Sequence, residues 1–72
     1  MDHKVLKRLG KNVRSIRLKR KWTQEKLAEM AGMHPVYVSY IEKGTRNPSI
    51  SKIIQLAIAL KCTPVEIFNH IF

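Results

Sequence analysis

Residues 23–44, TQEKLAEMAGMHPVYVSYIEKG, decide the fold of this chain. Thr23 is a suitable N-cap for a first helix, and Gly32 tolerates the left-handed conformation of a tight turn before a second helix. Both helices offer small or apolar side chains to one core, namely Leu27, Ala28, Ala31, Val38 and Ile41. Residues 23–43 or so therefore predict a helix-turn-helix, whose second helix can enter the major groove of DNA.

The charge of the chain predicts a polyanionic partner. Fourteen Lys and Arg residues stand against five Asp and Glu residues, which gives a formal charge of +9. Nucleic acid and an acidic membrane surface are the two partner classes that such a charge favours. No apolar run approaches the ~20 residues of a membrane span, and the basic N-terminus lacks the apolar core of a signal peptide. We expect a soluble, cytoplasmic protein.

The length and the cysteine content set further bounds. Seventy-two residues make one domain, 1–72, near the lower size limit for an unassisted hydrophobic core. Cys62 is the sole cysteine, which excludes an intramolecular disulfide and a multi-thiolate metal site. Its position after an apolar run indicates a buried structural thiol and fits a reducing compartment.

Three further helices are expected around the helix-turn-helix. Residues 4–19 carry an apolar stripe, residues 50–60 are apolar nearly all round after the N-cap Ser49, and Thr63 begins a capping box. The last helix is expected to run to the chain end at Phe72. No alternating strand pattern occurs, so the sequence predicts an all-α domain of five short helices.

The C-terminal helices, about residues 49–72, carry more bulky apolar side chains than they need to cover the other three. An exposed apolar patch on a small protein indicates a partner surface. We expect a homodimer through these helices, with the interface formed by Ile54, Ile58, Ile67 and Phe68.

Several motifs resemble the phage-repressor-like helix-turn-helix family, often called the XRE family. They are Thr23-Gln24, Leu27-Ala28, Ala31-Gly32, residues 39–44 (SYIEKG) and residues 46–49 (RNPS). The resemblance implies a five-helix, lambda-repressor-like DNA-binding domain and a transcriptional regulator that binds a pseudo-palindromic operator in double-stranded DNA as a homodimer. Within this family, a chain this short looks most like the controller proteins of restriction-modification systems, with phage and plasmid repressors as near neighbours.

The resemblance also assigns roles to individual residues. Base readout falls on His34, Pro35, Val36, Tyr37, Ser39, Tyr40 and Arg46. Phosphate contacts fall on Thr23, Gln24, Lys43 and Asn47. Arg17 and Glu42 match an ion pair that joins the first helix to the end of the reading helix and fixes its angle.

Two of these positions depart from the controller pattern. Controller proteins often carry Arg-Thr where this chain has Pro35-Val36, and proline cannot bind guanine bidentately as arginine does. Val36 could instead pack on a thymine methyl group, and guanine contact could shift to Arg46. Specificity could also depend on the shape of the DNA.

Other classes of function remain as alternatives or are disfavoured. An antitoxin whose main partner is another protein also accounts for the apolar surplus of the C-terminal helices. A membrane-surface peptide is disfavoured, since the turn-punctuated pattern is that of a globular domain rather than one long helix. The three scattered histidines and few carboxylates indicate neither an enzyme nor a metal site, and no cofactor or small-molecule ligand is expected. The sequence names neither the operator nor the regulated genes, and leaves activation and repression both open.

Overall fold

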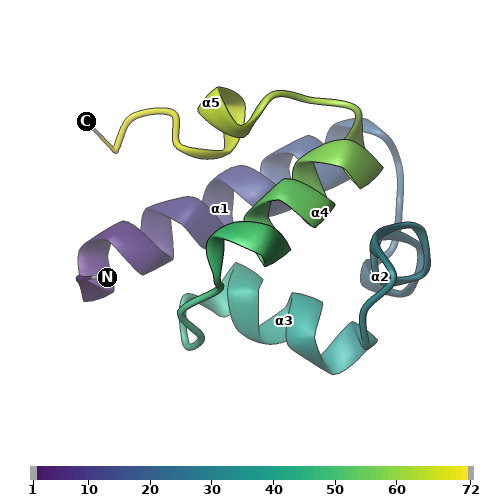
Figure 1. The fold of residues 1–72 in the computed structure, drawn as a ribbon, viewed down its shortest axis with the longest axis horizontal. Helices are drawn as coiled ribbons and strands as arrows, with labels where there is room; N and C mark the ends of the chain where they lie inside the picture. Colours follow the sequence, from purple (N-terminus) through teal and green to yellow (C-terminus); the bar gives the residue numbers. More distant parts are fainter. Residues whose placement is uncertain (1, 72) are drawn as a thin grey trace.

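The computed structural model describes residues 2–71, and five helices make up the fold of this range (Figure 1). They are α1 His3–Lys19, α2 Gln24–Ala31, α3 Pro35–Lys43, α4 Ile50–Leu60 and α5 Pro64–Ile67. The described residues contain no strand, so the predicted all-α, five-helix fold is confirmed. None of these helices is both long enough and apolar enough to cross a membrane.

The ends of α2 and α3 follow the predicted local signals. The Thr23 hydroxyl accepts a hydrogen bond of 3.0 Å from the backbone N–H of Lys26 and so caps α2. Gly32 ends α2 with φ +69°, and Gly44 ends α3 with φ +75°. Both angles lie in the left-handed region that glycine enters without steric cost, so the turn between the helices and the turn after α3 are each sharp.

The core lies where α1, α2, α3 and α4 meet, with one residue from α5. Its fully or nearly buried apolar side chains are Leu9, Val13, Leu27, Ala28, Ala31, Val38, Ile41, Ile53, Leu56, Ala57, Ala59, Leu60 and Ile67. The five core residues predicted for the helix-turn-helix are all among them. Trp22, Cys62 and Phe68 are partly buried and pack against this cluster. In Figure 1, α3 and α5 lie on opposite sides of the α1 and α4 helices.

A glycine inside α1 lets this helix approach the end of α3. A Cβ atom placed on Gly10 would lie 2.6 Å from the carbonyl oxygen of Glu42 and 2.8 Å from its carbonyl carbon. Contacts that close to backbone atoms do not occur in folded proteins, so the hydrogen of Gly10 is what permits the approach. The position of α3 is therefore set in part by the backbone of α1.

The last helix is shorter than the sequence predicts. α5 ends at Ile67, and Phe68 is its C-cap, whereas a helix running to Phe72 was expected; Phe72 itself lies outside the described residues. The side-chain amide of Asn12 donates hydrogen bonds of 2.8 Å to the carbonyl of Ile67 and 2.7 Å to that of Asn69. The amide of Asn12 thus binds the last carbonyl of α5 and one carbonyl beyond the helix, and the chain continues as turns.

The structure also corrects the expected apolar patch. Ile67 is 0% exposed and belongs to the core, so the prediction that it lies in an exposed patch is wrong. The reason is that α5 is a single turn with one inward position, and Ile67 occupies it. Ile54 and Ile58 are exposed, at 43% and 72%, and Phe68 is half-buried.

Candidate nucleic-acid interface

The face of α3 that points away from the core carries the residues predicted to read bases. Val38 and Ile41 are buried, whereas Val36 is 48% exposed and Tyr40 is 38% exposed. The remaining predicted positions on this helix, Pro35, Tyr37 and Ser39, are half-buried. The helix therefore has one anchored side and one side with apolar and hydroxyl groups open to solvent, as an element that enters a DNA groove requires.

Arg46, from the loop after α3, lies over two tyrosine rings of this face. Its guanidinium carbon is 5.9 Å from the ring centre of Tyr37 and 5.5 Å from that of Tyr40. Cation–π contacts at such distances attract the guanidinium to the rings and limit its freedom. Together with His34 and Val36, these three side chains line a shallow hollow of about 350 Å³. Two regions that the resemblance assigned to base readout are thus brought together.

Lys52 joins this face although sequence reasoning missed it. Its ammonium nitrogen lies 5.9 Å from the ring centre of Tyr37. The residue follows the N-cap Ser49 by three positions and donates its backbone N–H to the Ser49 hydroxyl at 3.2 Å. The sequence signals the cap, but the ring contact depends on how α4 crosses α3, which no local pattern reveals.

His34 has a structural task beside its predicted role in readout. It is the N-cap of α3, and its Nδ1 accepts a hydrogen bond of 3.1 Å from the backbone N–H of Val36. An imidazole that accepts through Nδ1 carries its proton on Nε2 when neutral. The group left for a ligand is therefore a donor, which suits a phosphate oxygen or a base acceptor.

The predicted ion pair between α1 and α3 is present and buried. Arg17 Nε lies 2.7 Å from Glu42 Oε2, and Arg17 Nη2 lies 3.0 Å from Glu42 Oε1. The side chains are 9% and 3% exposed. Arg17 Nη1 also donates to the carbonyl of Trp22 at 2.7 Å, which ties the pair to the segment before α2. The hydrogen bond to Glu42 raises the pKa of Arg17 above its ordinary value, so the guanidinium stays charged in this setting.

Gln24 is part of the same buried network. Its side-chain nitrogen donates to Glu42 Oε1 at 3.1 Å, a contact that the sequence did not predict. The amide keeps a second N–H, and the exposed Thr23 lies beside it at the start of α2. Helix-start N–H groups with an oriented amide are suited to an anion. The phosphate role of Gln24 stays a prediction, now with a group that positions the side chain.

The other two predicted phosphate contacts lie at the far end of α3. Lys43 is in its last turn and Asn47 is in the loop that follows, and both are exposed. The loop itself is anchored, because the N–H of Thr45 donates to the carbonyl of Tyr40 at 3.0 Å. The hydrogen bond from Gln24 to Glu42 brings the start of α2 against the last turn of α3, next to Lys43.

Known proteins resemble both the sequence and the fold. The chain is 44% identical over 70 residues to control protein C.SmaI of Serratia marcescens, which covers 97% of this chain and 81% of that protein. The crystal structure of the restriction-modification controller protein C.AhdI from Aeromonas hydrophila matches with a TM-score of 0.86 and 38% identity, over 88% of this chain and 96% of that one.

A third match is a controller protein bound to DNA. The C.Esp1396I tetramer in complex with its natural 35-base-pair operator has a TM-score of 0.82 and 30% identity, over 89% of this chain and 84% of that one. None of these names denotes an enzyme. The model of the helix-turn-helix family HTH_3 matches residues 13–67, which include the buried ion pair and the whole exposed face of α3. The chain belongs to this helix-turn-helix family.

Proposed function

We propose that the protein is a transcriptional regulator of the restriction-modification controller type, which binds a pseudo-palindromic operator as a homodimer. The observation that carries the proposal is the face of α3, where Arg46 lies over Tyr37 and Tyr40 beside the exposed Val36. The formal charge of +9 supplies attraction to phosphates. The likeness to control and controller proteins supports the regulatory role.

In this proposal the two sets of side chains have separate tasks. Thr23, Gln24, Lys43 and Asn47 contact phosphates and set the depth of α3 in the major groove. Arg46 supplies a guanidinium for guanine, and Val36 supplies an apolar surface for a thymine methyl group. The ion pair and Gly10 hold α3 at a fixed angle to α1, so the reading face meets the groove in one orientation.

The dimer in this proposal uses exposed apolar side chains of α4 and α5. Ile58 and Val65 are 72% and 77% exposed, and Ile54 is 43% exposed. Phe68 borders a hollow of about 390 Å³ on the same end of the chain, together with Val65. Self-complementary packing of such a surface produces a two-fold axis. Two reading helices about 34 Å apart would then face successive major grooves.

The first experiment separates specific from non-specific DNA binding. The protein is titrated by fluorescence anisotropy against the region upstream of its own gene and against a random duplex of equal length, from low to high salt. We expect preference for the upstream region and a steep fall of affinity with salt, because bound phosphates release counterions. Equal affinity for both duplexes, or no dependence on salt, contradicts the proposal.

Two matched variants then distinguish reading from phosphate contact. Arg46→Ala should lower discrimination between the two duplexes by about 1–3 kcal/mol, since a base contact is lost. Lys43→Ala should weaken binding to both duplexes alike. If both variants reduce specific and non-specific binding equally, Arg46 is not a reading residue.

The dimer is tested by sedimentation equilibrium at micromolar concentration. We expect a mass near twice the monomer's 8.4 kDa, and a shift toward monomer for Ile58→Asp. Met30→Asp is the matched control, because Met30 is 47% exposed but lies on α2. A monomer mass for the unaltered chain, or equal effects of the two substitutions, rules out this interface.

A further inference from the structure

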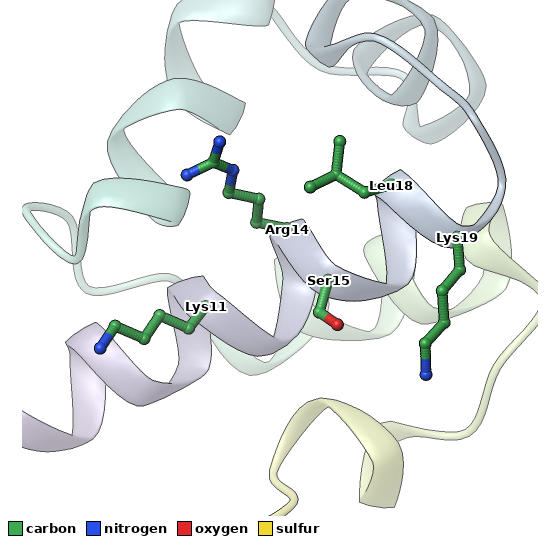
Figure 2. A pocket seen from close by; sticks show the side chains of 5 residues that line it. All are labelled: Lys11, Arg14, Ser15, Leu18 and Lys19. Atoms are coloured by element: carbon green, nitrogen blue, oxygen red, sulfur yellow. The ribbon is translucent and has the colours of Figure 1, made fainter.

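The outward side of α1 carries an open groove that the proposed function does not use. The groove has a volume of about 490 Å³. All the residues that line it lie on α1, at positions that recur with helical spacing. The lining residues are Lys11, Arg14, Ser15, Leu18 and Lys19. Figure 2 shows Arg14 and Leu18 projecting from one side of α1 and Lys19 from the other, with Ser15 between them. The reading face, by contrast, comes from α3 and the loop after it.

The three cations of this groove have no carboxylate partner within residues 2–71. The ion pairs in that range join Arg17 to Glu42 and Lys26 to Glu29. Of the other three Asp and Glu side chains, Asp2 caps α1, Glu66 belongs to the capping box of α5, and Glu25 lies in the first turn of α2. Three unneutralised positive charges on two turns of helix repel one another, and an anionic partner relieves that repulsion.

An exposed leucine distinguishes this groove from an ordinary basic surface. Leu18 is 51% exposed and projects from the same side of α1 as Arg14 (Figure 2). A DNA backbone offers phosphates to Lys11, Arg14 and Lys19, but it leaves the leucine in water. A protein segment with carboxylates around an aliphatic side chain satisfies both features, since apolar burial adds to charge pairing.

The spacing of the groove fits a helix as its occupant. Residues at i, i+3, i+4 and i+7 of α1 form a ridge-and-groove surface, and a second helix fits across it with its own i and i+4 side chains. We propose that this groove docks an acidic, amphipathic helical segment of a partner protein. The aliphatic side chain of that segment packs on Leu18, and its carboxylates pair with Lys11, Arg14 and Lys19.

A second copy of the chain is a poor occupant. Two such grooves are both cationic and repel each other. The exposed residues Ile54, Ile58 and Val65 of α4 and α5 are apolar and lack carboxylates, and the Glu66 carboxylate already accepts from the Thr63 backbone N–H at 2.7 Å. On α2, Glu25 and Glu29 are exposed, but Glu29 lies 4.0 Å from Lys26, and the net charge of +9 on each copy opposes docking of two copies. Charge complementarity therefore favours a different, acidic protein.

The experiment uses a defined probe with the full-length chain. A fluorescent, end-capped peptide of two Leu-Glu-Glu-Ala-Leu-Glu-Glu heptads is compared with the same peptide in which serine replaces leucine. We expect the leucine peptide to bind roughly tenfold more tightly, because only it buries apolar area on Leu18. Amide chemical shifts should change along residues 11–19. Equal binding of the two peptides, or shifts confined to α3 or to α4 and α5, overturns the proposal.

Variants of the groove complete the test. Leu18→Ser should weaken the leucine peptide about tenfold and leave DNA affinity unchanged, which keeps the result independent of the proposed operator binding. Arg14→Glu should weaken the peptide more than Lys61→Glu, an equal charge change outside the groove. If Arg14→Glu instead lowers DNA affinity beyond the effect of Lys61→Glu, the groove holds phosphates. If Leu18→Ser alters self-association, a second copy fills the groove. Either result overturns the proposal.

Discussion

The helix-turn-helix and the C-terminal segment of this chain are held in place by different contacts. α3 is fixed to α1 by the buried pair of Arg17 and Glu42 and by the backbone approach at Gly10. α5 is one helical turn, held by its capping box and by two hydrogen bonds from the Asn12 amide. The polar contacts of α3 are buried and tolerate little change. The hydrogen bonds that hold α5 are partly exposed, although its Ile67 is buried in the core. The orientation of α3, which carries the proposed reading face, is therefore fixed by buried contacts.

The largest loss of stability is expected for a substitution of Glu42, which would loosen the attachment of α3 to α1. Glu42→Gln keeps the shape of the side chain but leaves the charge of Arg17 buried without its counter-ion, and removal of one partner of a buried pair costs about 3–5 kcal/mol. The free energy of unfolding in urea measures the loss. Glu29→Gln is the control, since its 4.0 Å pair with Lys26 is exposed and should contribute below about 1 kcal/mol.

A double replacement sharpens the same test. Arg17→Met with Glu42→Leu removes both charges and fills their volume with apolar groups, so most of the lost stability should return. Operator affinity should stay reduced even then, because Gln24 loses the oxygen that positions its amide. If Glu42→Gln costs no more than Glu29→Gln, the pair does not anchor α3.

Gly10→Ala is expected to cause the next largest loss of stability. The added methyl group would meet backbone atoms of Glu42 rather than a flexible side chain, so α1 and α3 must separate. Overpacking of this kind costs about 1–3 kcal/mol, even though alanine is the better helix former. Gly32→Ala is a matched comparison, because its Cβ would meet nothing within 4 Å and only the positive φ is strained, by about 1 kcal/mol. A thermal melt in which Gly10→Ala is neutral or stabilising contradicts the close approach.

The same contrast accounts for what the sequence could predict. α2 and α3 were predictable because their signals are local: Thr23 caps one, Gly32 and Gly44 end them, and the apolar spacing points inward. The length of α5 was not predictable, since it depends on Asn12, which lies 55 residues from Ile67. The apolar pattern alone also gave a wrong prediction for the exposure of Ile67, because its burial depends on where a one-turn helix meets the core.

The candidate site likewise has one part that could be predicted from the sequence and another that could not. Its residues on α3 and the ion pair were identified through the family resemblance, and the pair lies where that resemblance placed it. The contacts of Gln24 with Glu42 and of Lys52 with Tyr37 were missed. Both depend on how helices cross, which is set by tertiary packing and leaves no periodic signal in the chain.

Asn12→Ala is expected to affect the C-terminal segment and spare the reading face. The carbonyls of Ile67 and Asn69 lose their donor, and since Asn69 is exposed, water replaces part of the loss. We expect about 1 kcal/mol of destabilisation and faster hydrogen exchange in α5, with little change in α2 and α3. Ser15→Ala, an exposed change on the same helix, is the control. Uniformly faster exchange in all helices would show that α5 is not a separate unit.

The smallest expected effect is a gain in stability at the end of α4. α2 and α3 end at glycines with positive φ, but α4 ends at Lys61 with φ +54°. A residue with a side chain in that conformation costs about 1–2 kcal/mol, and Lys61→Gly removes this cost. Glycine also makes the unfolded chain more flexible, which offsets about 0.4–1 kcal/mol of the gain. The net change in the free energy of unfolding should therefore be a stabilisation of roughly 0.5 kcal/mol.

Lys26→Gly, within α2, is the control. It should instead destabilise by about 1 kcal/mol, because there glycine replaces a good helix former. If Lys61→Gly destabilises as much as Lys26→Gly, then the end of α4 is not strained, and both halves of the molecule terminate their helices equally well.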